Sequence, residues 1–219
     1  DYFRTLLIGR DPMDTRGIAT DLGEKQIKIL GPGGINTQVL AAINIACWDI
    51  KGKALGKSVH EMLGGAQSRI RTYIAGGYYA EGKGLEELKD EVRFNVEEMH
   101  AGAVKIKIGD PNQGVAGDMR RVDAARQAVG DDVTLMVDAN CALDLATSLE
   151  FAGQLKEFGV YWFEEPFAEG PALNQAFKEY LQEHSPGTLV ADGEFAPPPY
   201  FFDLVEKGWI DVVQHDFRA

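Results

Sequence analysis

The sequence predicts an α/β fold made of repeated strand–helix units around a parallel sheet. Short runs rich in β-branched and aromatic residues recur between residues 70 and 216, and helix-length segments separate them. Each repeat has roughly the 30 residues expected of a βα unit. Six strands are predicted in this way, whereas a closed (β/α)8 barrel has eight. The pattern alone therefore leaves two architectures, an open doubly wound sheet or a barrel whose last two units lie outside this chain.

The predicted elements follow one another in order. The strands are expected at residues 70–76, 103–109, 132–140, 160–166, 188–194 and 211–216. The helices between them are expected near residues 85–100, 115–129, 144–157, 172–183 and 200–206. Before them, apolar residues at steps of three and four predict an amphipathic helix over 35–55, with Asn36 or Thr37 as its cap. The segment GGAQSR (64–69) predicts a linker into the first strand.

The composition excludes several classes of partner. The chain has 219 residues, of which 45% are hydrophobic and 26% charged, as in an ordinary globular protein. Its formal net charge of −12 disfavours nucleic acid and anionic membrane surfaces, because like charges repel. The two cysteines, Cys47 and Cys141, have no metal-type spacing and predict no disulfide framework. We therefore expect a cytoplasmic protein that acts on a small molecule.

Charged and polar side chains follow five consecutive predicted strands at their carboxyl ends. In a parallel barrel these ends form one rim, where the active site is built. Taken singly, each residue is more often structural, as a helix cap, a solvated charge or a turn residue. The ordered set predicts a functional rim. In chain order it contains Lys105, Lys107, Asp138, Asn140, Glu164, Glu165, Glu194 and Asp216.

Two features of this set indicate a catalytic site, namely its carboxylates and its pair of lysines. Asp138, Glu164 and Glu194 would supply hard oxygen ligands from neighbouring strand ends, as magnesium prefers. No histidine or thiolate joins them, which counts against zinc. Lys105 and Lys107 are two residues apart on a strand and so point to the same face. Two ammonium groups held together would lower each other's pKa toward the range useful for a base.

The ordered motifs VKIKIG, LMVDAN, WFEEP, ADGE and DVVQHD resemble the enolase superfamily, and within it the mandelate racemase branch of the mandelate racemase/muconate lactonizing enzyme family. The helix AAINIACWDIKGKALGKSVHEMLGG (41–65) resembles the segment that leads into that branch's barrel. The resemblance implies an incomplete (β/α)8 TIM-type barrel over residues 66–219, without strands seven and eight. Residues 1–65 would be the mostly helical C-terminal part of an N-terminal capping domain. We therefore expect a partial chain of a longer enzyme that associates into homo-oligomers.

The resemblance also implies roles for the residues of the rim. Mg2+ would be bound by Asp138, Glu164 and Glu194. Lys107 would be the base, and Lys105 would assist it.

Two further roles follow from the same resemblance. Asn140, in the D-x-N motif, would contact the substrate. Asp216 would be the catalytic aspartate that orients a histidine of the seventh strand. His215 is not that histidine, because adjacent strand residues point to opposite faces.

The implied reaction removes a proton alpha to the carboxylate of a small substrate. The resulting enediolate is stabilised by magnesium acting as a Lewis acid. We expect dehydration of a sugar acid, and the alternative is racemisation or epimerisation of a 2-hydroxy acid through the same enediolate. A catalytically silent homologue or a non-functional fragment stays open, because the acid–base partner of the seventh strand is not in this sequence. A nucleotide binder is poorly supported, because no glycine-rich phosphate motif follows the early strands.

Overall fold

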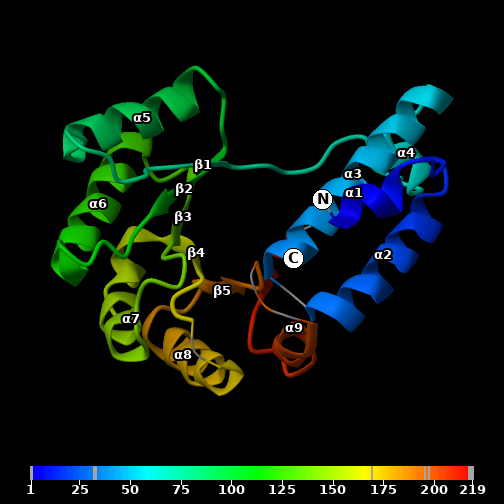
Figure 1. The fold of residues 1–219 in the computed structure, drawn as a ribbon. Helices are drawn as coiled ribbons and strands as arrows, with labels where there is room; N and C mark the ends of the chain where they lie inside the picture. The colour runs from blue at the N-terminus through cyan, green and yellow to red at the C-terminus, as the bar shows by residue number, and fades with distance from the viewer. Residues whose placement is uncertain (1, 32–33, 169, 195, 197, 217–219) are drawn as a thin grey trace. The chain divides into compact units, whose positions relative to one another are not determined.

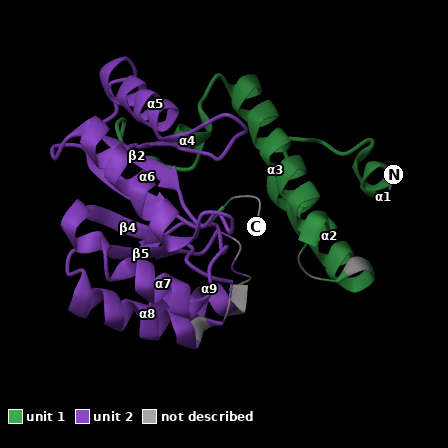
Figure 2. Cartoon of the chain, turned by 90° about the vertical axis from the view of Figure 1, so that its left-hand side faces the viewer, with its two compact units in different colours: residues 1–70, 215–219 green, residues 71–214 purple. Residues whose placement is uncertain are grey.

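The computed structural model describes residues 2–31, 34–168, 170–194, 196 and 198–216 (Figure 1). The chain divides into two compact units, one of residues 1–70 with 215–219 and the other of residues 71–214 (Figure 2). The domain boundary expected between residues 65 and 66 stays a prediction. None of the described helices is long and apolar enough to cross a membrane.

The first unit is helical in its described part. Its helices are α1 (Tyr2–Leu7), α2 (Thr15–Leu30), α3 (Gly34–Leu55) and α4 (Val59–Met62). The side chain of Asp14 caps α2 by accepting a hydrogen bond from the backbone N–H of Gly17 at 3.0 Å. Ile18 and Leu22 of α2 pack with Cys47 of α3 in a small apolar core. The unit therefore buries its apolar side chains between two long helices.

Helix α3 confirms a helix where the sequence predicts one over 35–55 and corrects its cap. Its amphipathic character is not confirmed, because Val39 and Ile50 of the predicted apolar face are exposed. The helix begins at Gly34, so neither Asn36 nor Thr37 is the cap. Instead, the Thr37 hydroxyl accepts a hydrogen bond from the Gln26 amide at 3.1 Å and ties α3 to α2. Near the end of α3, a side chain at Gly52 would place its Cβ 2.7 Å from the Lys57 carbonyl oxygen. Only glycine allows that close approach.

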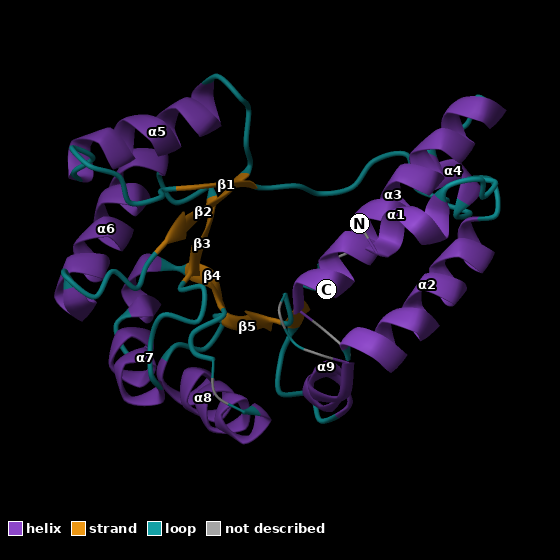
Figure 3. Ribbon diagram, viewed as in Figure 1, coloured by secondary structure: helices purple, strands orange, loops and turns teal. Residues whose placement is uncertain are grey.

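The second unit alternates strands and helices, as the sequence predicts. Its strands are β1 (Ile74–Gly76), β2 (Ala103–Lys107), β3 (Thr134–Asp138), β4 (Val160–Glu164), β5 (Leu189–Asp192) and β6 (Val212–Val213). Its helices are α5 (Leu85–Glu97), α6 (Gly114–Val129), α7 (Leu145–Ala152), the 3-10 helix η1 (Leu155–Phe158), α8 (Pro171–His184) and α9 (Pro198–Glu206). Figure 3 shows α5 to α8 along one face of the curved sheet.

The strand order decides between the two predicted architectures. The described residues form one six-stranded parallel sheet in the order β1-β2-β3-β4-β5-β6. Each strand pairs with its neighbour in the sequence, and the order never reverses. A doubly wound sheet would reverse at a switch point. The winding is that of a (β/α) barrel.

The two faces of this sheet bury different side chains. On the helix-facing side, Val104 and Ile106 of β2 join a large apolar core with the phenylalanines of β4 and α8. Phe163 and Phe177 meet edge to face there, with ring centroids 5.2 Å apart. On the other side, Met136 and Trp162 form a second, smaller cluster. Because strand side chains alternate, the lysines of β2 lie on this second face.

Candidate active site

The strand register sets three of the predicted site residues side by side. Lys107 at the end of β2 is paired with Asp138 at the end of β3, and Asp138 is paired with Glu164 at the end of β4. Neighbouring parallel strands lie about 4.8 Å apart. The backbone pairing alone therefore brings the lysine and both carboxylates together at the carboxyl ends of the strands.

Their side chains form a buried ion-pair network. The Lys105 ammonium lies 2.5 Å from Glu164 Oε1 and 3.1 Å from Asp138 Oδ2. The Lys107 ammonium lies 2.6 Å from the same Asp138 oxygen and also donates to Asn140 Oδ1. Asp138 and Glu164 are each 1% exposed, so unpaired they would be strongly destabilising. The two lysines compensate this charge.

The pKa of Lys105 differs from the prediction. Burial lowers it, but the charges of Glu164 and Asp138 and the hydrogen bond to Glu164 outweigh burial, and the net shift is upward. The expectation that a neighbouring lysine would lower it was wrong for Lys105, because carboxylates surround this ammonium. Lys105 therefore stays cationic at neutral pH.

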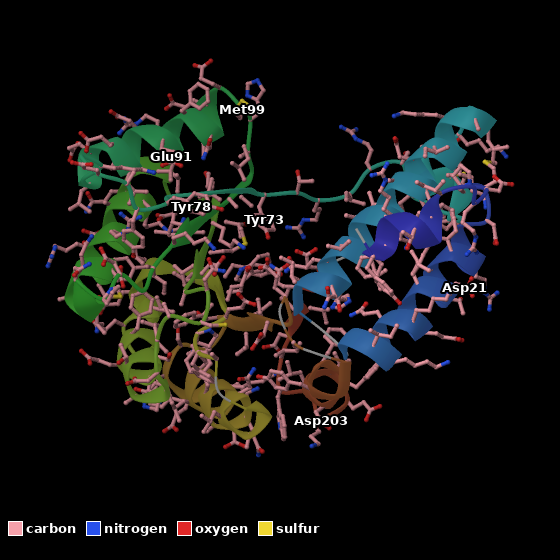
Figure 4. The ribbon with its side chains drawn as sticks, viewed as in Figure 1. Asp21, Tyr73, Tyr78, Glu91, Met99 and Asp203 are labelled. Carbon is pink, nitrogen blue, oxygen red and sulfur yellow. The ribbon has the colours of Figure 1, made fainter. Side chains whose placement is uncertain are left out.

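Three residues that were not predicted from the sequence hold Glu164 and Lys105. Glu164 Oε2 accepts hydrogen bonds from the Trp162 indole at 3.0 Å and the Gln214 amide at 2.8 Å. The hydroxyl of Tyr73, labelled in Figure 4, accepts from Gln214 at 3.3 Å and from Lys105 at 3.4 Å. Trp162 lies two residues before Glu164 on β4, so the two-residue strand period was the available signal.

Glu165 is a further buried carboxylate at these strand ends. It is 1% exposed and has a left-handed backbone, with φ at 42°, which is unusual for a glutamate. Burial raises its pKa to about 7, and the charges of Glu194 and Asp192 add to the rise, against the hydrogen bond from Asn140. Glu165 was expected on the rim from the sequence, but without an assigned role.

The carboxylates suit a hard divalent cation by their chemistry. Burial raises the pKa of Glu164, and the charge of Asp138 raises it further. Glu194 follows β5 and is half-buried, and its charge acts on Glu165 and on Cys141. Such mutual repulsion among oxygen donors is what a bound cation relieves.

The arrangement of these carboxylates is not that of a metal site, although their chemistry suits one. Among the described residues, no group of three or more His, Cys, Asp or Glu side chains is arranged to hold a metal ion. The ammonium groups of Lys105 and Lys107 contact the Asp138 and Glu164 oxygens instead. The metal-ligand roles of Asp138, Glu164 and Glu194 stay predictions.

Asp216 belongs to the segment that groups with the first unit, so its role at this rim also stays a prediction.

A cavity of about 670 Å³ opens beside Lys107 within the second unit. Lys107 and Asn140 lie in its wall, which is completed by the turns that follow β1 and β2. The ring of Tyr78, labelled in Figure 4, faces the Lys107 ammonium with 5.5 Å between the nitrogen and the ring centroid. Polar side chains from these turns share the lining, among them Tyr79, Lys83, Asp110, Asn112 and Gln113.

The fold and this rim define a (β/α)-barrel domain of the enolase type. Residues 87–218 match the family described as enolase C-terminal domain-like. Residues 1–64 match the N-terminal domain of the mandelate racemase/muconate lactonizing enzyme family. The chain belongs to the mandelate racemase/muconate lactonizing enzyme family of the enolase superfamily.

The curated relatives include two proteins named as dehydratases and one named as a cycloisomerase. The arabinonate dehydratase of Saccharolobus solfataricus is 34% identical over 89% of this chain and 48% of its own length. The L-talarate/galactarate dehydratase of Salmonella typhimurium is 35% identical over 73% of this chain and 39% of its own. The D-galactarolactone cycloisomerase of Agrobacterium fabrum is 36% identical over 96% of this chain and 54% of its own. The chain thus spans about half the length of the curated relatives it matches.

Solved structures share the fold. The 3,6-anhydro-D-galactonate cycloisomerase of Zobellia galactanivorans superposes with a TM-score of 0.82 at 27% identity, over 98% of this chain and 58% of that one. An enolase from Bradyrhizobium, complexed with magnesium and mandelic acid, superposes with a TM-score of 0.79 at 24% identity, over 94% of this chain and 55% of that one.

Proposed function

We propose that this chain carries the proton-abstracting site of a magnesium-dependent sugar-acid dehydratase. One observation carries the proposal. The Lys107 ammonium hydrogen-bonds to Asp138 and Asn140, and Lys107 lies in the wall of a cavity at the carboxyl ends of the strands. A base must lie within reach of a bound substrate, and the place of Lys107 in the cavity wall supports this role.

The donor set supports magnesium as the cofactor. Asp138, Glu164 and Glu194 would hold it, since all three are carboxylates and lie at the carboxyl ends of consecutive strands. When bound, Mg2+ supplies Lewis-acid stabilisation of the negative charge that develops on the substrate carboxylate.

The two lysines have different roles in removing the alpha proton. Lys107, in its neutral form, accepts the alpha proton at Nζ, and the ammonium produced is held by Asp138 Oδ2 and Asn140 Oδ1. Lys105 stays charged and buried between Asp138 and Glu164, where it keeps both side chains in place. The two lysines therefore have different tasks, although one strand presents both.

The cavity and the relatives support one class of substrate. Tyrosine, asparagine, glutamine and charged side chains in the cavity wall can hydrogen-bond to the hydroxyl groups of a substrate, and apolar residues share the lining. Two of the relatives are named as dehydratases of sugar acids. We therefore propose a polyhydroxylated acid as the substrate.

The test is turnover of a panel of sugar acids by the full protein with magnesium. We expect a 2-keto product from at least one acid. Exchange of the alpha proton with solvent, without keto product, would show a racemase or epimerase and overturn the dehydratase assignment. If no acid gives either turnover or proton exchange, the proposal is overturned entirely.

A further inference from the structure

We propose that Glu165 is a positioning residue that fixes the side-chain amide of Asn140 in the orientation that Lys107 requires. The inference rests on the proposed role of Lys107 as the base. It goes beyond that role because Glu165 acts through Asn140 and not on the lysine itself.

The amide of Asn140 lies between two groups with opposite requirements. Its Oδ1 accepts from the Lys107 ammonium, and its Nδ2 donates to Glu165 Oε2 at 3.2 Å. An ammonium can only donate, and Glu165 Oε2 is the acceptor that faces the other end of the amide. Turning the amide over would set N–H groups against the ammonium and an oxygen against the carboxylate. Glu165 therefore selects the orientation that gives Lys107 an acceptor.

Backbone bonds hold Glu165 in place on both sides. Its N–H donates to the Ala191 carbonyl at 2.9 Å, and its carbonyl accepts from the Cys141 N–H at 2.7 Å. The Asn140 N–H in turn donates to Asp138 Oδ1 at 2.9 Å. The ends of β3, β4 and β5 are thus linked, and the carboxylate of Glu165 has a fixed place relative to Asn140.

The local backbone is specialised at the same positions. Asn140, Cys141 and Glu165 all have positive φ, at 44°, 60° and 42°. Asparagine tolerates this region, whereas glutamate adopts it far less readily. A buried carboxylate in such a conformation is kept in place by its surroundings and is well suited to orient another group.

The test is a double-mutant cycle between Glu165→Ala and Asn140→Ala in the full protein, read as kcat for keto-product formation. We expect E165A to lower kcat about 10- to 100-fold, as the loss of a supporting partner does at comparable sites. In the N140A background, E165A should change kcat less than about threefold, because its target is gone. Glu165→Gln keeps an oxygen that can accept from Asn140 Nδ2 and should stay within about threefold of wild type.

Asn174→Ala supplies a matched control. Asn174 and Asp192 form another buried amide–carboxylate hydrogen bond, at 2.7 Å, on α8 and β5 rather than at the Asn140 amide that contacts Lys107. N174A should lower the melting temperature, and the fold-change that it causes in kcat should multiply with that of N140A. If the effects of E165A and N140A also multiply, or if E165Q is as impaired as E165A, Glu165 has only a structural role and the inference is wrong.

A crystal structure of E165A gives a readout that does not depend on turnover. We expect the Asn140 side chain to leave its present rotamer, and an unchanged rotamer in contact with Lys107 would overturn the inference. The proposed function fails separately, if Lys107→Ala leaves turnover unchanged.

Discussion

Lys107 donates hydrogen bonds to Asp138 and Asn140 and also lines a cavity, as a base that acts on a bound substrate would. This arrangement leads to a first prediction about a single residue. Replacing Lys107 with alanine should lower kcat by about 10²–10⁴-fold, the usual contribution of a general base. The measurement is steady-state turnover of the best sugar acid. Lys156→Ala, at an exposed position on η1, is the control and should leave kcat within about twofold of wild type. Equal loss in both variants would contradict the assignment.

Asp118 of α6 gives a prediction about pH. It is 2% exposed and accepts hydrogen bonds from the Tyr79 hydroxyl at 2.5 Å and the Gly109 N–H at 2.7 Å. Burial raises its pKa, and these bonds and the charge of Arg121 only partly oppose the rise. An acid with a raised pKa in the folded state binds its proton more tightly there than in the unfolded chain. Its contribution to stability is therefore present at low pH and lost as pH rises above its unfolded pKa.

The free energy of unfolding should show this difference. The stability of wild type relative to Asp118→Asn should fall as pH rises from about 4 to 7, since asparagine does not titrate. Urea unfolding at several pH values measures it, with Asp123→Asn on the same helix as the control for lost charge. A relative stability that rises over this range would contradict the argument.

Part of the site could be predicted at this scale. Lys107, Asp138 and Glu164 follow from one rule, that polar residues at the carboxyl ends of barrel strands face the site. Gln214 and the hydrogen bond from Asn140 to Glu165 could not be predicted, because they depend on side chains that only the folded sheet brings together.

At the scale of elements, the turn after β1 depends on Gly77. Its φ is +63°, and a Cβ there would lie 2.8 Å from Ile106 Cβ. Gly82, later in the same connection, has a φ of +74°, and a Cβ there would meet no atom within 4 Å. Both alanine substitutions force a left-handed residue, at a cost of about 1–2 kcal/mol. Only Gly77→Ala adds a clash with the core.

The two variants therefore separate conformational strain from packing. Gly77→Ala should be less stable than Gly82→Ala by about 1–3 kcal/mol, the usual cost of overpacking. Urea unfolding gives both values. Equal losses would mean that Ile106 moves aside at no cost, contrary to the packing described for β2.

Most helices and strands could be predicted because the spacing of their apolar residues matches the face that each element buries in the fold. The predicted helix over 115–129 and the observed α6 (Gly114–Val129) differ by one residue at the start. Helix α2 was not predicted. Gly17 and Gly23 interrupt its pattern and lower its intrinsic helix propensity, so packing against α3 is what stabilises it.

At the scale of the whole molecule, charge and topology point to the same rim. The net charge of −12 includes the carboxylates at the carboxyl ends of β3, β4 and β5, which consecutive parallel strands bring to one rim. Strand periodicity alone did not distinguish a barrel from a doubly wound sheet. That choice depended on the order of the strands, which is set by contacts between distant segments.

The most direct test of the central claim is calorimetric titration of Mg2+ into the full protein, wild type and Asp138→Asn side by side. We expect one saturable site per chain in wild type and at least about a tenfold loss of affinity in D138N, because a charged oxygen ligand is removed. Glu157→Gln, at an exposed position on η1, should bind Mg2+ as wild type does. Equal affinity in wild type and D138N, or no binding by wild type, would contradict the magnesium site on which the proposed function depends.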